Sequence, residues 1–413
     1  MIKKRIAILF DNFGPYHLAR LRAVAGLHDL LAIQFGEKSR DYAWESGREA
    51  EAFQIRTINP EGSGAELSRN EFASRLARAL SSFAPDIVFV PGWGFRGALL
   101  AITWCVVDNG CPFVVMSEST SWDAQRSAWR EWVKGRVLGL ASAALAGGTP
   151  HRAYLEKLGM ERGRISLGYD VVDNDFFSAS VVPKSAKCDV SPYFLASARF
   201  VKKKNLFSLI RAFSLYSQSP QKATVPWNLC LLGDGELKGE IIAYCAELGV
   251  QVVAHAPWEN SNKTRSGFKP VVYMPGFQQI GDLPVFYSRA GCFIHASTIE
   301  QWGLVVNEAM ASMLPVIVSH RCGCAQDLVQ ERINGFTFDP SNVNELAGLM
   351  SRVSSMSEES RAAMGLASQE IIKEWGPSRF AAGAEQAIAT AIEKPRKKAA
   401  WADRLLLEVL SRK

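Results

Sequence analysis

The chain has 413 residues, of which 48% are apolar and 21% charged, a composition that excludes a disordered protein and predicts about two domains. Its apolar runs are of strand length and fall far short of the roughly 20 residues that a membrane-spanning helix needs, so we expect no transmembrane segment. The eight cysteines are scattered without disulfide-like or zinc-binding spacing, which favours a reducing, cytoplasmic setting and no metal site. The formal net charge of +6 predicts anionic partners.

In chain order, short apolar runs alternate with longer amphipathic stretches, a pattern typical of strands and helices in a parallel sheet. The first expected strands are residues 5–10, 30–35, 86–90, 112–117 and 142–147. The rhythm breaks over 171–192, and further strands are expected at 193–198, 228–233, 271–276, 291–297, 315–319 and 336–339. We therefore predict an α/β protein with two Rossmann-like, doubly wound parallel-sheet domains that face a central cleft.

The aperiodic stretch 171–192 predicts an interdomain connection, which places one domain over residues 1–185 and a second over 186–376. A similar polar stretch, 256–270, predicts a surface loop. Doubly wound sheets bind ligands at the carboxyl ends of their strands, so the functional residues should lie in the loops that follow those strands.

Residues 298–319, TIEQWGLVVNEAMASMLPVIVS, follow an expected strand and contain a glycine turn before a helix that should begin near Leu304. The backbone N–H groups of Gly303 and Leu304 would bind an anion such as a diphosphate, helped by the helix dipole. Glu300 precedes the helix and Glu308 lies about one turn inside it, so one carboxylate would hold a ribose and the other a sugar. Two solvated surface glutamates are the alternative interpretation.

This stretch resembles the E-x7-E signature of retaining glycosyltransferases with the GT-B fold, specifically glycosyltransferase family 4 (glycosyl transferases group 1). The resemblance extends through most of the C-terminal half of the chain. The segments that carry it are SARFVKKKNL (197–206), LLGDGEL (231–237), MPGFQQIGDLPVFYSRA (274–290) and INGFTFDP (333–340). In GT-B proteins a segment such as 377–413 usually crosses back to the N-terminal domain, and we expect the same here.

The resemblance implies roles for further residues of the second domain. Gly233 and Asp234 match the family's Gly-Asp-Gly turn, and Gly276 with Phe277 begins the element that cradles the nucleotide base. All four are assigned to donor binding, together with the residues of the 298–319 stretch.

Arg199 and Lys204 match the two basic residues with which the family holds the donor diphosphate. The residue chemistry supports this assignment independently, because a pyrophosphate leaving group gains negative charge as the glycosidic bond breaks and cations stabilise that charge. The neighbouring Lys202 and Lys203 are expected to be solvated. Met313 and Asn205 stand where the family usually has glycine, which should affect local geometry more than activity.

In the first domain, DNFGPYHLARL (11–21) follows the first strand as the family's acceptor-side loop does. Gly14 would allow the backbone to approach the substrate closely, and we include it among the donor-binding residues. His17 lies just inside the next helix and is either catalytic or structural. Glu118 follows strand 112–117, where many relatives have a histidine, and either acts on the acceptor hydroxyl or caps the following helix.

The family resemblance implies a retaining, metal-independent hexosyltransferase that uses a UDP- or GDP-linked sugar as co-substrate and no other cofactor. The departing phosphate would accept the proton of the acceptor. Residues 92–101 and 146–159 resemble transferases of surface-polysaccharide or glycolipid assembly, which implies a glycan or lipid-linked acceptor. Two alternatives remain open: a GT-B nucleotide-sugar epimerase and a catalytically silent nucleotide-sugar-binding scaffold.

Residues 119–140 place Trp122, Trp129 and Trp132 among Arg126, Arg130, Lys134 and Arg136, a mixture suited to an anionic membrane surface. An ordinary amphipathic helix is equally consistent with this pattern. The basic tail, 394–413, would reinforce membrane contact. No nucleic-acid-binding module is recognisable. We therefore expect a cytoplasmic protein that associates peripherally with the inner face of the plasma membrane and does not bind nucleic acid.

Overall fold

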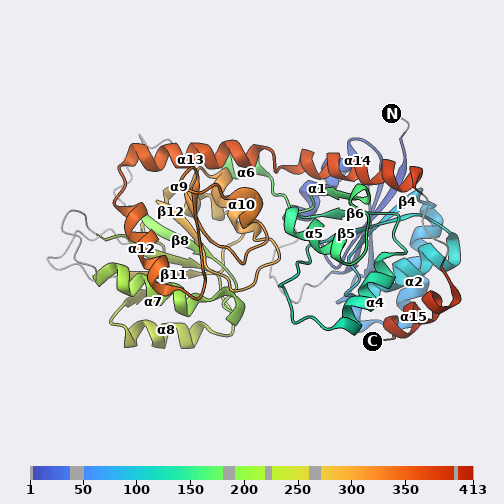
Figure 1. The fold of residues 1–413 in the computed structure, drawn as a ribbon, viewed down its shortest axis with the longest axis horizontal. Helices are drawn as coiled ribbons and strands as arrows, with labels where there is room; N and C mark the ends of the chain where they lie inside the picture. Colours follow the sequence, from blue (N-terminus) through green and yellow to red (C-terminus); the bar gives the residue numbers. More distant parts are fainter. Residues whose placement is uncertain are drawn as a thin grey trace. The chain divides into compact units, whose positions relative to one another are not determined.

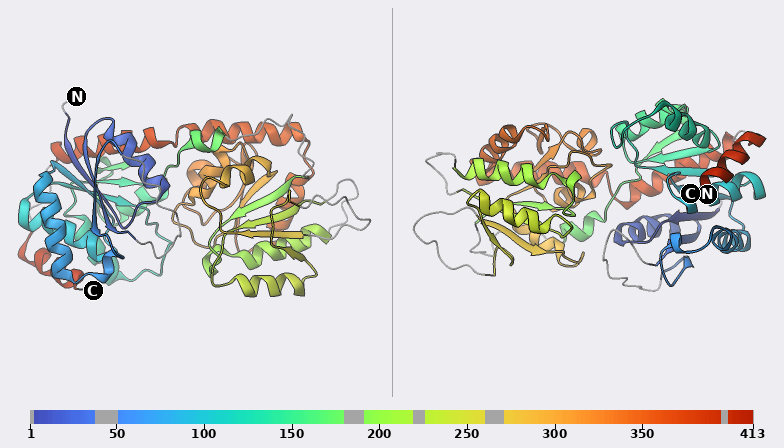
Figure 2. Two further views of the ribbon diagram at one scale, coloured as in Figure 1. Left: turned by 180° about the vertical axis from the view of Figure 1, so that it is seen from behind. Right: turned by 90° about the horizontal axis from the view of Figure 1, so that it is seen from below.

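The computed structural model describes residues 3–37, 51–179, 191–218, 226–259, 271–394 and 399–412. The chain forms two compact units, one comprising Met1–Val172 with Trp375–Lys413 and the other comprising Asp173–Glu374. The C-terminal helices therefore belong to unit 1, as their red colour beside its blue and green elements shows (Figure 2). The boundary predicted near residue 185 lies outside the described residues.

Unit 1 contains a parallel sheet with the strand order β3-β2-β1-β4-β5-β6-β7. This order starts at a central first strand and proceeds outward in both directions, as in a Rossmann fold. Its strands are β1 (Arg5–Phe10), β2 (Asp29–Gly36), β3 (Gln54–Asn59), β4 (Ile87–Pro91), β5 (Phe113–Ser117), β6 (Ala143–Ala146) and β7 (Ile165–Leu167). Its α-helices are α1 (Pro15–Ala25), α2 (Arg69–Phe83), α3 (Arg96–Thr103), α4 (Ala128–Leu138), α5 (Thr149–Lys157), α14 (Pro377–Glu393) and α15 (Trp401–Ser411).

Alternate side chains of these strands enter two apolar cores, one on each face of the sheet. In β1, Ile6 and Ile8 pack with α1 and α14 on one face, while Ala7 and Leu9 pack with α2, α3 and α15 on the other. Both faces are buried because crossover helices cover them, which explains why the central strands are largely apolar. The contact between α14 and α1 is visible in Figure 1.

Unit 2 repeats this architecture with the strand order β10-β11-β9-β8-β12-β13-β14. Its strands are β8 (Tyr193–Ser197), β9 (Asn228–Leu232), β10 (Gln251–Val253), β11 (Val271–Gly276), β12 (Cys292–His295), β13 (Val316–Ser319) and β14 (Gly335–Phe338). Its α-helices are α6 (Asn174–Ser178), α7 (Leu206–Gln218), α8 (Lys238–Glu247), α9 (Leu283–Arg289), α10 (Leu304–Ala311), α11 (Ala325–Leu328), α12 (Val343–Ser354) and α13 (Glu358–Lys373). Helices α7, α8 and α12 contribute side chains to one core of this sheet. Of these helices, α7 and α8 lie below the sheet in the view of Figure 1.

Each strand expected from the sequence is present, within two residues at either end. Three observed strands were not expected, namely β3, β7 and β10, and all three lie at sheet edges. The expected connection 171–192 also contains the short helix α6, which Asp173 caps by accepting a hydrogen bond from the N–H of Phe176 at 3.2 Å. Most of the loop expected at 256–270 lies outside the described residues. Within the described residues, no helix is long and apolar enough to cross a membrane.

Candidate functional site

The topology of unit 2 brings two of the predicted loops together. β8, the first strand of its sheet, pairs with β9 on one side and in parallel with β12 on the other, so the direction in which successive strands are added to the sheet reverses at β8. The loop after β8 carries Arg199 and Lys204, and the loop after β12 carries Glu300 and Gly303. Ligands of doubly wound sheets bind at this kind of switch point.

Lys204 and Glu300 form a buried ion pair, in which the Lys204 ammonium group contacts Oε2 of Glu300. The same oxygen accepts a hydrogen bond from the hydroxyl of Ser297 at 3.3 Å and lies 3.3 Å from Nε2 of His295. Lys203 approaches the other oxygen, Oε1, at 3.8 Å. Lys203 was expected to be solvated, but it belongs to this cluster.

The cluster keeps Glu300 ionised. Burial by itself would raise the pKa of this carboxyl, but the charge of Lys204, with His295 and Lys203, outweighs burial and holds the pKa well below its ordinary value. Burial lowers the pKa of His295 more than Glu300 raises it, so His295 is neutral at neutral pH. Two lysines and one carboxylate therefore leave a net positive charge at the end of β12, which suits an anionic ligand.

Helix α10 begins at Leu304, as the sequence predicts, and Glu308 lies about one turn inside it. Gly303 caps the helix with a φ of 105°, a left-handed conformation that favours glycine. A side chain at position 303 would also place its Cβ within 3.3 Å of Nε2 of His295. The first N–H groups of α10, which have no partner within the helix, thus lie beside the Lys204–Glu300 cluster.

Glu308 has a different environment from Glu300. It is fully buried, and its Oε2 accepts a hydrogen bond from the hydroxyl of Tyr287 on α9 at 2.7 Å. On the same helix, Oδ1 of Asn307 accepts a hydrogen bond from the indole N–H of Trp302 at 2.9 Å. The alternative of two solvated glutamates is therefore wrong, because both carboxylates are buried and bound by other side chains.

The loop that carries Arg199 is fixed by the glycine turn after β9. The N–H of Phe200 donates to the carbonyl of Asp234 at 2.8 Å, and the N–H of Gly233 donates to the carbonyl of Gly276 at 3.0 Å. Gly233 has a φ of 127°, and a Cβ there would collide with the carbonyl of Ala198. The Gly-Asp-Gly turn therefore holds the backbone around Arg199.

The remaining predicted donor residues lie near this turn. The carboxylate of Asp234 binds the ammonium group of Lys238 at 2.8 Å and the N–H of Gly235 at 2.8 Å. Gly276 ends β11 with a φ of 89°, and the side chain of Phe277, which follows it, is partly exposed. These residues join β9 and β11 at the same edge of the sheet as the Lys204–Glu300 cluster.

In unit 1, Gly14 is the N-cap of α1, and its N–H donates to Nδ1 of His17 at 3.0 Å. This contact gives His17 a structural role at the start of the helix. Burial, and then the charge of Arg20, lowers the pKa of His17 to about 3, so the ring is neutral and its proton is on Nε2.

Glu118 follows β5 and is half-buried. The next helix, α4, begins only at Ala128 and is capped by Ser127, whose hydroxyl accepts from the N–H of Arg130 at 3.4 Å. The alternative that Glu118 caps this helix is therefore wrong. Its carboxyl instead neighbours that of Asp170, which follows β7, and burial together with the charge of Glu118 raises the pKa of Asp170.

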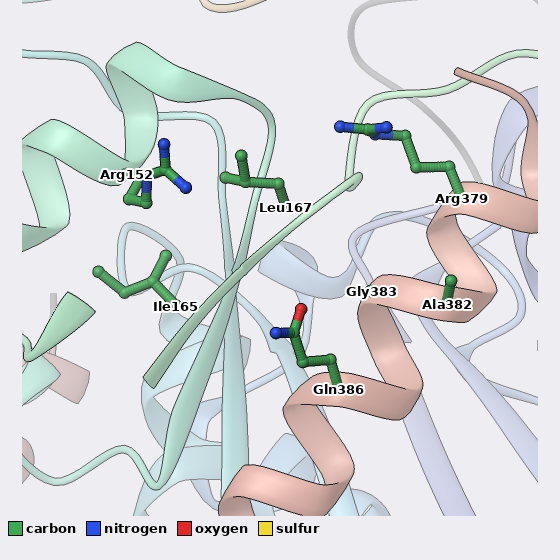
Figure 3. Close-up of a pocket in the computed structure, with 7 residues that line it drawn as sticks. All are labelled: Arg152, Ile165, Leu167, Arg379, Ala382, Gly383 and Gln386. Carbon is green, nitrogen blue, oxygen red and sulfur yellow. The ribbon is translucent and has the colours of Figure 1, made fainter. Parts of the chain in front are cut away.

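A pocket of about 340 Å³ also lies in unit 1, between α5, β7 and α14 (Figure 3). Arg152 and Arg379 extend from the two helices that flank it, and Gln386 lies on α14. None of the residues predicted from the sequence lines this pocket, so it is separate from the predicted site.

The sequence did not indicate several residues that contact the predicted ones. These are Ser297 and His295 beside Glu300, Tyr287 beside Glu308, and Asp170 beside Glu118, together with Arg20, which lies 3.8 Å from Asp170. One signal could have indicated His295, because it is a polar residue in the otherwise apolar strand CFIH just before the Glu300 loop. Tyr287 and Asp170 gave no such signal, since each meets its partner, Glu308 or Glu118, only through the fold.

The comparisons with known proteins agree with this description. Residues 181–370 match the family model described as glycosyl transferases group 1. Among curated proteins, the chain is 31% identical over 139 residues to the sulfoquinovosyl transferase SQD2 of Arabidopsis thaliana, and 28% identical over 126 residues to an uncharacterised glycosyltransferase, MJ1607, of Methanocaldococcus jannaschii. These matches cover 33% and 30% of this chain but only 26% and 27% of those proteins.

Solved structures match over nearly the whole chain. HepE of Anabaena, in complex with UDP and glucose, has a TM-score of 0.69 at 16% identity and covers 94% of this chain and 99% of its own. Sucrose-phosphate synthase of Thermosynechococcus elongatus has a TM-score of 0.68 at 19% identity, with 95% and 100% covered. The likeness shows that the fold is GT-B.

Proposed function

We propose that this GT-B chain, whose residues 181–370 belong to the glycosyl transferases group 1 family, transfers a sugar from a nucleotide-sugar donor to an acceptor hydroxyl. The observation that carries the proposal is the cluster of Lys204, Lys203 and Glu300 at the switch point of unit 2, beside the N-terminus of α10. A diphosphate leaving group needs cations and N–H donors in such a place, because its charge grows as the glycosidic bond breaks.

In this proposal Lys204 and Arg199 bind the diphosphate, and Glu300 holds Lys204 in position and contacts the sugar. Glu308, oriented by Tyr287, binds the ribose. The donor is a UDP-sugar, for which the complexes of HepE with UDP and glucose give support by analogy. Transfer retains the anomeric configuration, needs no metal, and delivers the sugar to a glycan or lipid-linked acceptor in surface-polysaccharide or glycolipid synthesis.

Calorimetric titration with UDP-, GDP-, ADP- and TDP-linked sugars, with and without magnesium, tests the donor site. We expect saturable, magnesium-independent binding of one UDP-sugar, strongly weakened in Glu308→Ala and retained in Glu240→Ala, an exposed glutamate on α8. Absence of binding to every donor would contradict the proposal.

The products distinguish the alternatives. A transferase releases the nucleotide and forms a glycoside, whose anomeric configuration proton NMR reads directly. An epimerase would return an isomeric nucleotide sugar without nucleotide release, and a silent scaffold would bind the donor and leave it unchanged. Inversion of configuration would contradict the retaining mechanism alone.

A basic aromatic surface on unit 1 supports the peripheral membrane association. Trp129 and Trp132 on α4 are 67% and 51% exposed and stack at 4.9 Å between ring centroids. On the adjacent α15, Trp401, Leu405 and Val409 follow one another at helical spacing and are at least half exposed. An ion pair between Arg136 and Asp403 joins the two helices.

The exposed basic side chains around this surface are those of Arg130, Arg136, Arg404 and Arg412, of which Arg136 pairs with Asp403 and Arg412 with Glu408. Arg126 and Lys134, predicted to belong to the same surface, instead bind Asp123, Glu131 and Tyr154. Exposed indoles and arginines together match the interface of an anionic bilayer.

Co-sedimentation with vesicles tests this association. We expect binding to vesicles rich in phosphatidylglycerol, little binding to phosphatidylcholine vesicles, and loss of binding in Trp129→Ala/Trp132→Ala. Leu366→Ala, which removes a similarly exposed apolar side chain from unit 2, should bind as the unchanged chain does. Equal binding of all variants would contradict membrane contact through α4.

A further inference from the structure

Three neighbouring strands of unit 1 end beside a pair of carboxyl groups. Glu118 follows β5, Asp170 follows β7, and Gly147 follows the strand between them, β6. A Cβ on Gly147 would collide with Oδ2 of Asp170. The glycine therefore provides the space in which the carboxyl of Asp170 reaches toward that of Glu118.

Asp170 is almost completely enclosed, with 1% of its surface exposed. Neither of its oxygens accepts a hydrogen bond from an N–H group or a hydroxyl of the described residues. After burial, the neighbouring Glu118 contributes most to raising the pKa of Asp170. Two carboxylates cannot hydrogen-bond each other, so a contact between these two carboxyls is favourable only when one of them carries a proton.

One cation faces this pair from α1. Nη2 of Arg20 lies 3.8 Å from Oδ1 of Asp170, while Nε and Nη2 donate to the carbonyl of Val171 at 3.4 and 3.3 Å. The guanidinium also lies over the ring of Tyr169, 4.9 Å from its centroid. Arg20 thus balances one negative charge, which is the charge of a carboxyl pair that keeps one proton.

Three titratable side chains of this region, those of Tyr169, His17 and His151, are neutral. Burial, with the charge of Glu118, raises the pKa of Tyr169 well above its ordinary value, and His17 is neutral because its pKa is lowered. Nδ1 of His151, on α5, accepts a hydrogen bond from the N–H of Gly148 at 3.0 Å and so carries no proton. Burial and the adjacent Glu118 also raise the pKa of Asp170, which agrees with the shared proton.

We propose that Glu118 and Asp170 share one proton and together bind the hydroxyl of the acceptor, Glu118 as the contacting residue and Asp170 as its positioning residue. This inference rests on the proposed transferase function. The half-buried Glu118 lies toward the solvent at the carboxyl end of the sheet, where substrates of this fold bind, whereas Asp170 is buried behind it. A protonated Asp170 donates to Glu118 and leaves the carboxylate of Glu118 to accept the hydrogen bond of the acceptor hydroxyl.

Substitutions of Asp170 separate this role from a purely structural one. Asp170→Asn supplies an amide N–H that donates to Glu118 at any pH, so we expect an acceptor KM within about threefold of the original. Asp170→Ala leaves Glu118 without its donor and should raise the acceptor KM by about tenfold or more. Asp175→Asn, at an exposed position of α6, is the matched control.

The pH profile gives the sharper readout. When the shared proton dissociates at high pH, two negative charges repel each other and acceptor binding weakens, which produces an alkaline limb in kcat/KM for the acceptor. Asp170→Asn should lack this limb, whereas Asp175→Asn should keep it. An identical alkaline limb in Asp170→Asn would overturn the proposal.

Infrared difference spectroscopy tests the shared proton without an activity assay. We expect the carbonyl band of one protonated carboxyl at neutral pH, lost in Asp170→Asn and in Glu118→Gln. If no donor or acceptor is turned over, the transferase function fails while this measurement still decides the shared proton. Absence of the band in the unchanged protein would overturn the inference even if transfer is observed.

Discussion

The polar clusters of the two units occupy corresponding places, each at the carboxyl end of a parallel sheet, but the pKa of the buried carboxyl is shifted in opposite directions. In unit 2, Lys204 keeps Glu300 ionised and its pKa low. In unit 1, burial and the adjacent Glu118 raise the pKa of Asp170 well above its ordinary value. The architecture therefore provides the location, and the nearest charged partner decides whether a buried carboxyl carries a proton.

The largest expected effect comes from removing the ammonium group of Lys204 in unit 2. Lys204→Ala should lower turnover by about 10²–10³-fold, because a preorganised charge that stabilises the leaving group is lost. Nucleotide release measures the effect, and Lys202→Ala, an exposed lysine two residues away, is the control. Equal losses in both variants would mean that Lys204 has no special place in the site.

The two clusters should give opposite dependences of stability on pH. The low pKa of Glu300 stabilises the folded state above its unfolded pKa near 4.5, and this stability is lost as pH falls through the folded pKa. The raised pKa of Asp170 stabilises the folded state at pH values below its unfolded pKa near 3.8. This contribution is lost as the pH rises through the folded pKa.

Urea unfolding at several pH values measures this contrast. Relative to the unchanged chain, Asp170→Asn should gain stability as the pH rises, whereas Glu300→Gln should lose roughly 2 kcal/mol near neutral pH and less in acid. If the unfolding free energies of the two variants changed with pH in parallel, the two clusters would not differ in how they depend on pH.

A smaller effect should come from the residue that ties the two loops of unit 2 together. Asn205 has a φ of 58°, and its amide donates to the carbonyls of Ala296 at 3.1 Å and Pro340 at 2.8 Å. Asn205→Ala should cost about 2 kcal/mol of unfolding free energy, because it adds left-handed strain and removes both hydrogen bonds. Asn205→Gly removes only the hydrogen bonds. Thermal unfolding should therefore place its stability between that of the unchanged chain and that of Asn205→Ala.

The smallest expected effect concerns the second glutamate. Tyr287→Phe removes the hydroxyl that donates to Glu308 and should weaken donor binding by about tenfold or less. Calorimetry measures it, with Tyr244→Phe on α8 as the control. Unchanged affinity in Tyr287→Phe would mean that this hydrogen bond does not orient Glu308 for the ribose.

The central strands could be predicted from the sequence because both of their faces are buried and their residues are mostly apolar, as in the run IVFVP of β4. The edge strands β3, β7 and β10 could not, because β3 alternates with exposed polar residues and the other two have only three residues each. Helix α6 was missed for the same reason, since five residues are too few to show helical periodicity.

The two departures from the family pattern have a structural explanation. Asn205 and Met313, which replace glycines, both have left-handed backbone conformations, with φ values of 58° and 61°. Asparagine tolerates this conformation well, whereas methionine does so at a cost in strain. The local geometry of the loop and turn is therefore kept by residues other than glycine.

By itself, the sequence determined the alternation of strands and helices, the start of α10 and the charged residues of the candidate site in unit 2, namely Arg199, Lys204, Glu300 and Glu308. These features depend on local periodicity, on helix capping and on motifs that are each contained in one short stretch. The tertiary structure alone decided which charges meet: Lys204 with Glu300, 96 residues apart, and Glu118 with Asp170 across Gly147. Parallel strands bring the ends of distant segments to one edge of a sheet, and burial there gives each carboxyl the pKa that its nearest partner allows.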